Sequence, residues 1–140
     1  MRTPRSLLKL AELGGDIYAI GGVDAGFNPL DTVERYDPGR DAWEAVAPMG
    51  ARRANPGVAV VGDEFVVVGG GTSVSLDTSE VHHRRENRWE LLEPLLEPGR
   101  SSLISATAGG GTILAIGGFV DADGVSSAVT PRVDALQLGG

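Results

Sequence analysis

The chain of 140 residues contains no cysteine, which excludes a disulfide framework, a zinc site built on cysteine and a thiol nucleophile. It also lacks long apolar runs: no segment approaches the roughly 20 apolar residues that a membrane-spanning helix needs. The N-terminal segment 1–13 is interrupted by charged residues and is a poor signal peptide. We therefore expect no membrane association, and a cytoplasmic location is favoured.

Positive charge is scarce. The chain has 12 basic against 19 acidic residues, a formal net charge of −7, which argues against binding to nucleic acid. Histidine is scarce as well: the two that occur, His82 and His83, are adjacent and would point to opposite faces of a strand. This composition argues against a zinc hydrolase centre, and we expect no metal and no cofactor.

Glycine, in contrast, is abundant, with 21 residues, about twice the ordinary usage of roughly 7%. Six of these glycines form three pairs, each after a short apolar run, in the sequences AIGG, VVGG and AIGG. The pairs are Gly21–Gly22, Gly69–Gly70 and Gly117–Gly118, and each begins 48 residues after the one before. A regular interval of this length indicates an internal repeat.

The residues around the pairs repeat as well. Arg5, Arg53 and Arg100 precede the first glycine of their pairs by 16 or 17 residues. Two apolar runs separated by a turn lie between each arginine and its glycines, which predicts a β-hairpin. A third strand follows a loop of variable length, and a fourth, with Trp43 or Trp89, completes the first two copies. The sequence predicts an all-β fold of four-stranded antiparallel units, and such units arranged radially form a β-propeller.

The first copy resembles the kelch repeat, with IYAIGG at 17–22, VERYDP at 33–38 (including Tyr36), Trp43 and Pro48-Met49. The second keeps the glycine pair, Glu80 and Trp89 but has His82 in the tyrosine position. The resemblance implies a single kelch-like propeller segment over residues 1–140, with blades at about 5–48, 53–95 and 100–140, the last lacking its fourth strand. The glycine pairs and the aromatic residues are expected to be framework, each glycine pair admitting a neighbouring aromatic side chain against bare backbone.

Three blades are too few for a closed ring, which usually has four to eight. An open arc would expose two blade faces and a sheet edge. We therefore expect either two chains that close head-to-tail into a six-bladed ring, or a longer propeller of which this chain is a piece. A monomeric arc that is stable alone is the third alternative, and the exposed edges disfavour it.

The loops after the glycine pairs, at 23–31, 71–77 and 119–129, differ in length and sequence while the flanking strands repeat. Variable loops on a constant frame are where binding specificity is expected. The candidate contact residues there are Phe27, Phe119, Asp24, Asp121 and Asp123, and each phenylalanine could either anchor a partner or pack onto its blade. The three repeated arginines could tie blades together through backbone carbonyls or form a positive rim suited to carboxylates.

No catalytic constellation is recognisable: there is no Gly-x-Ser-x-Gly elbow, and DADG at 121–124 lacks the further ligands of a calcium loop. Kelch-like propellers, as the resemblance implies, most often bind proteins. The preferred interpretation is a non-enzymatic protein-interaction or scaffold module. The alternative is a piece or subunit of a ring-closed kelch-like enzyme or carbohydrate-binding propeller.

Overall fold

The computed structural model describes residues 1–71, 73–94, 96, 98–122 and 126–138, so Asp123 lies outside the described residues. The architecture is all-β, as predicted. Its elements, in chain order, are β1 (Lys9–Leu13), β2 (Asp16–Ile20), β3 (Val33–Asp37), β4 (Ala42–Val46), β5 (Gly57–Val61), β6 (Glu64–Val68), β7 (Ser79–His83), β8 (Arg88–Leu92), β9 (Arg100–Ser101), β10 (Ile104–Ala108), the short 3-10 turn η1 (Gly109–Gly111), β11 (Thr112–Ile116), β12 (Phe119–Ala122), β13 (Ser126–Val129) and β14 (Val133–Gln137).

The strands form three antiparallel sheets of the repeat. The first sheet has the order β1-β2-β3-β4, the second β5-β6-β7-β8 and the third β10-β11-β14. Short turns join the first two strands of each sheet; in the first sheet this turn is Gly14-Gly15, at φ +64° and +86°, which a side chain would disfavour. The predicted four-stranded unit is therefore present twice, and the third sheet has three strands.

A fourth, small sheet of order β13-β12-β9 was not anticipated from the sequence. It forms because the loop after the third glycine pair is long enough to fold back on itself, pairing Phe119 with Val129 and Val120 with Ala128. The hairpin then adds to β9 through Val120 and Arg100. Part of the region predicted as a variable loop is thus a β-hairpin.

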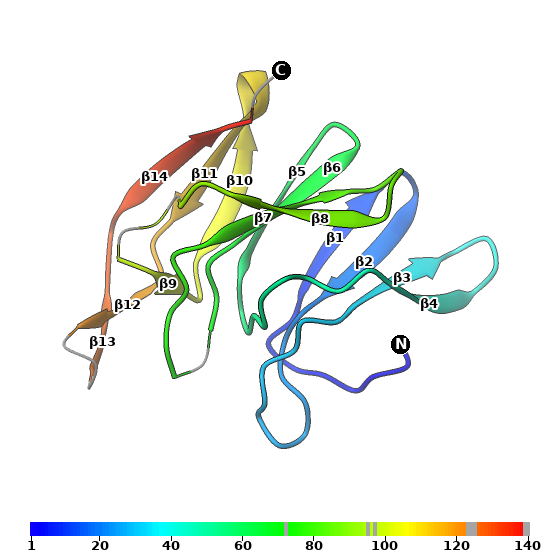
Figure 1. The fold of residues 1–140 in the computed structure, drawn as a ribbon, viewed down its shortest axis with the longest axis horizontal. Coiled ribbons are helices and arrows are strands. Elements are labelled where there is room, and N and C mark those ends of the chain that lie inside the picture. Colours follow the sequence, from blue (N-terminus) through cyan, green and yellow to red (C-terminus); the bar gives the residue numbers. More distant parts are fainter. Residues whose placement is uncertain (72, 95, 97, 123–125, 139–140) are drawn as a thin grey trace.

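Figure 1 shows the three repeat sheets fanned out side by side, with β5 between β1 and β10 where the sheets converge. The loops that link the second and third strands of the first two sheets, together with the β12–β13 hairpin, lie on the lower side of this view. The turns that join the first two strands lie on the upper side. The structure thus gathers the three variable segments at one end of the arc.

Two hydrophobic clusters fill the spaces between the sheets. The first joins the first and second sheets and contains Ala11, Leu13, Tyr18, Ile20, Val33, Met49, Phe65 and Val67. The second joins the second and third sheets and contains Ala59, Val66, Val68, Val81, Leu96, Leu103, Ile113 and Ala115. Successive β6 residues enter opposite clusters, which is why its apolar run is continuous.

Candidate interaction surface

The repeated arginine joins adjacent blades through its backbone. Arg53 lies just before the second sheet, yet its N–H donates to the carbonyl of Leu30 at 3.0 Å and its carbonyl accepts from Gly22 N at 2.9 Å. Both partners belong to the loop between β2 and β3 of the first sheet. One residue of the second repeat therefore holds the variable loop of the first.

The side chain of Arg53 binds the next loop along. Its Nη1 donates to the carbonyls of Gly69 and Thr78, both at 2.8 Å, and its Nη2 donates to Glu80 Oε1 at 2.8 Å. The guanidinium is fully buried. The two ends of the β6–β7 loop are thereby fastened to one cation, which fixes where the loop leaves the sheet.

The same arrangement occurs in the other two repeats. Arg5 binds the carbonyls of Gly21 and Thr32 at 3.0 and 2.8 Å and the carboxylate of Glu34 at 2.8 Å. Arg100 binds the carbonyls of Gly117 and Arg132, both at 3.0 Å, and pairs with Asp134. All three guanidinium groups are buried, so they adopt the tying arrangement and do not form an exposed positive rim.

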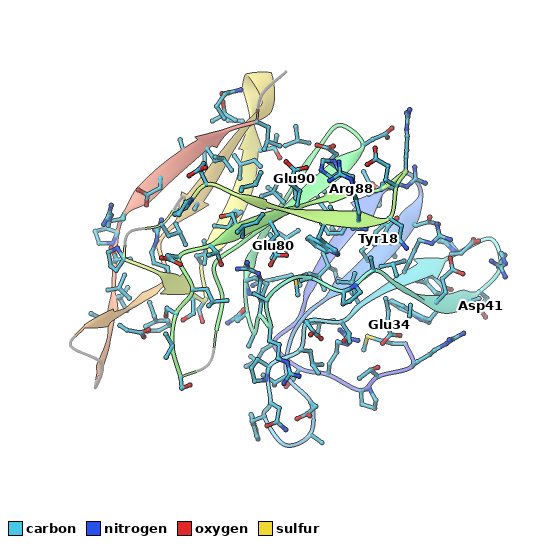
Figure 2. All side chains as sticks on the ribbon, viewed as in Figure 1. Tyr18, Glu34, Asp41, Glu80, Arg88 and Glu90 are labelled. Carbon is cyan, nitrogen blue, oxygen red and sulfur yellow. The ribbon has the colours of Figure 1, made fainter. Side chains whose placement is uncertain are left out.

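The glutamates of these pairs accept further hydrogen bonds from the segment that enters each sheet (Figure 2). Glu80 accepts from Gly50 N at 2.6 Å and from Ala51 N at 3.2 Å. Glu34 accepts in the same way from Arg2 N and Thr3 N, at 2.6 and 3.0 Å. Burial alone would raise the pKa of Glu34, but these hydrogen bonds outweigh burial and hold that pKa below its usual value.

The glycine pairs meet backbone. Gly21 has φ +58°, and a Cβ there would overlap the carbonyl oxygen of Arg53; at Gly69 a Cβ would overlap the carbonyl of Arg100. The expectation of an aromatic side chain at the pair is therefore wrong, because the closest atoms there are the carbonyl of the next blade's arginine and an aliphatic side chain. At Gly117 the nearest atom is the Thr130 carbonyl, 3.6 Å from the Cβ position.

The framework aromatics differ in their surroundings. Trp89 packs on Phe65 and His82, with ring centroids 5.5 and 4.9 Å away, and its Nε1 donates to the Ala47 carbonyl at 2.8 Å. Trp89 therefore joins the second sheet to the end of the first. Trp43 rests on Tyr36, with centroids 5.1 Å apart, within its own sheet.

Each variable segment exposes a large apolar side chain. Phe27 is 76% exposed, Val74 67%, Phe119 40% and Val129 77%. We call these four residues the loop surface, since they belong to the three segments gathered at one end of the arc (Figure 1). Neither phenylalanine is buried on its blade.

The acidic candidates hold the loops in place. Asp24 Oδ1 accepts from Gly26 N and Asn28 N at 2.8 and 3.0 Å, and its bonds, that to the Asn28 side chain first, lower its pKa. Asp121 Oδ2 accepts from Ser75 N at 2.5 Å, which ties the β12–β13 hairpin to the β6–β7 loop. These carboxylates position the apolar residues beside them.

Sequence reasoning missed one further repeated feature. Leu7, Asn55 and Ser102 all have positive φ, at +54°, +49° and +53°, and stand 47 or 48 residues apart. Asn55 N donates to the Leu7 carbonyl at 2.7 Å, and Ser102 N donates to the Asn55 carbonyl at 3.0 Å. The interval was visible in the sequence, but three unlike residue types concealed a shared backbone role.

Two searches of the described ranges found nothing. No group of three or more His, Cys, Asp or Glu side chains is placed there to hold a metal ion. No helix in that part of the chain is long and apolar enough to cross a membrane.

Comparison with known proteins agrees with the repeat geometry. The kelch motif matches residues 4–50. Kelch-like protein 35 of Mus musculus is 32% identical over 114 residues, which are 80% of this chain and 19% of that protein. Kelch-like protein 40 of Mus musculus is 31% identical over 116 residues, 82% of this chain and 18% of that protein.

A third relative, the Influenza virus NS1A-binding protein homolog of Mus musculus, is 42% identical over 79 residues, 56% of this chain and 12% of that protein. The chain thus spans a fifth or less of the length of these curated relatives. Their repeat sequence and the observed antiparallel sheets lead to one assignment: the chain belongs to the kelch-repeat β-propeller family.

Proposed function

We propose that this chain is a non-enzymatic protein-interaction module that contacts its partner through the loop surface. The observation that carries this proposal is that three successive variable segments each expose a large apolar side chain at the same end of the arc. Exposed apolar residues that cluster on a rigid frame are typical of protein-binding sites.

The rigidity of the frame supports the same function. Phe27 sits at φ +61°, in a loop closed by the hydrogen bonds of Asp24 and anchored at its ends by Arg5 and Arg53. A side chain held in this way loses little conformational freedom when a partner covers it, which favours affinity. One relative is itself named for binding a protein.

The charge of the chain indicates which partner is expected. The net charge is −7, and Asp24 and Asp121 lie beside the apolar residues of the loop surface. A complementary partner presents apolar side chains with basic residues around them.

Variants of the loop surface test the function. We expect Phe27→Ser with Val74→Ser to abolish capture of partner proteins from lysate, with binding to a captured and identified partner at least tenfold weaker. The matched control is Leu91→Ser: Leu91 is 67% exposed, as Val74 is, but lies on β8 away from the loops. Equal loss in the control, or unchanged binding by the double variant, would contradict the proposal.

The outer sheet faces raise a separate question of assembly. Ile104, Ile116 and Val133 lie in register across β10, β11 and β14 and are 67%, 39% and 57% exposed. We propose that a further blade covers this face, supplied either by a second copy arranged head-to-tail or by additional repeats of a longer chain. Light scattering separates the two: a mass of twice 14.5 kDa supports pairing of copies, and a clean 14.5 kDa monomer excludes it.

A further inference from the structure

A polar cavity lies between the first and second sheets, away from the loop surface. Its volume is about 320 Å³, and its lining residues include Tyr18, Arg35 and Glu44 from the first sheet and His82, Arg84 and Asn87 from the second repeat. Figure 2 labels Tyr18 in the space between these sheets. The cavity has room for a group larger than one water, whose share of liquid volume is about 30 Å³.

Unpaired nitrogen atoms converge on this cavity. In the described part of the chain, five buried side-chain polar atoms have no hydrogen-bond partner, and three belong to residues that line it: Arg35 Nε, Arg84 Nε and His82 Nδ1. The other two are serine hydroxyls. Buried donors without partners are rare and costly, so a cluster of three indicates a missing partner.

The existing ion pairs leave these edges free. Arg35 uses Nη1 on Asp16, at 3.4 Å, and Nη2 on Glu44. Arg84 uses Nη2 on Asp16, at 3.8 Å, and on the Gly14 carbonyl, at 3.5 Å. The Nε–H of each guanidinium remains available as a charged donor for an acceptor oxygen.

The local charge balance leaves room for one proton to accompany a ligand. Two guanidinium groups face two carboxylates, and neutral His82 adds nothing. Burial lowers the pKa of His82, so the imidazole is uncharged at neutral pH; its Nε2 lies 3.4 Å from Asn87 Oδ1. An added negative charge would make protonation of the imidazole favourable and turn Nδ1 into a donor.

We propose that this cavity binds a compact tetrahedral oxyanion through Arg35 Nε, Arg84 Nε and His82 Nδ1. The oxyanion is either free in solution, as sulfate or phosphate, or a phosphoryl group on a polypeptide. The site is distinct from the loop surface and does not depend on it.

Isothermal titration with sodium sulfate in a fixed chloride background at pH 6 tests the site, because sulfate itself does not titrate near neutrality. We expect one saturable site per chain, weakened at least tenfold by Arg84→Gln and also by Arg84→Lys, which keeps the charge but loses the Nε–H. Arg85→Gln is the matched control, since Arg85 is 82% exposed and pairs with Asp63 outside the cavity. No saturable binding, or equal affinity in the Arg84 and Arg85 variants, overturns the proposal.

Two further measurements complete the test. Sulfate affinity should fall by up to tenfold per unit between pH 6 and pH 8 and become pH-independent in His82→Gln; in wild-type protein, the imidazole nitrogen shifts should show protonation on sulfate binding. An unchanged imidazole spectrum at saturating sulfate overturns the role of His82. A phosphoserine peptide that binds more tightly than inorganic phosphate assigns the polypeptide source, and the reverse order assigns the free anion.

Discussion

The second and third sheets are built from the same repeat but differ in what covers them. Val68, at the end of β6, is fully buried, whereas Ile116, at the same position of β11, is 39% exposed. The Arg53–Glu80 pair is almost completely enclosed, whereas Asp134, the partner of Arg100, is 21% exposed. An identical local pattern thus yields a closed core only where a neighbouring blade lies on each side, and stability in this fold resides between blades.

The largest difference is expected at the repeated arginines. Arg53→Gln removes a buried cation and leaves Glu80 uncompensated, which costs about 3–5 kcal/mol. Arg100→Gln leaves Asp134 in partial contact with water, so the loss should be about half as large. Urea unfolding of the two variants measures both values, with Arg85→Gln as a surface control. Equal losses would show that the two sheets are equally enclosed in solution.

The aromatic residues extend the comparison to the first sheet. Trp89→Ala removes the ring that packs on Phe65 and His82 and joins two sheets, and should cost about 3 kcal/mol. Trp43→Ala removes a ring stacked on Tyr36 within one sheet, and should cost about 1 kcal/mol. Thermal unfolding provides the ranking. Should Trp43→Ala prove the more harmful, the outer face of the first sheet must be covered.

Paired truncations on β6 and β11 probe the sheet faces directly. Val68→Ala removes two buried methyl groups and should cost about 1.5–2 kcal/mol. Ile116→Ala removes more carbon from a partly exposed position but should cost under about 1 kcal/mol, because water already reaches it. Denaturant midpoints of the two variants give the comparison. A cost at Ile116 that matches Val68 and depends on protein concentration would instead place a second copy on this face.

The fold was predictable where the signal is local, and the site only in part. Apolar runs, turn glycines and the 48-residue interval predicted the sheets, because strand formation depends on neighbouring residues. The β12–β13 hairpin escaped prediction because its segment has no counterpart in the other repeats. Phe27 was identified as a candidate, but its exposure depends on how Asp24 and Asn28 close the loop, and Val74 carried no distinguishing signal at all.

The smallest effect concerns the position where the first two repeats diverge, Tyr36 in one and His82 in the other. Burial lowers the pKa of His82 below its ordinary value near 6.5, so the folded state resists a proton that the unfolded state accepts. The stability contribution is therefore complete above about pH 6.5 and declines as the pH falls below it, by at most about 1.4 kcal/mol per pH unit. In buffers free of sulfate and phosphate, the difference in unfolding free energy between wild-type and His82→Tyr should change across pH 7 to pH 5, with the variant gaining relative stability. Parallel pH profiles would mean that His82 titrates alike in both states, and the ring stacked 4.8 Å from Phe65 would then have to be open to water.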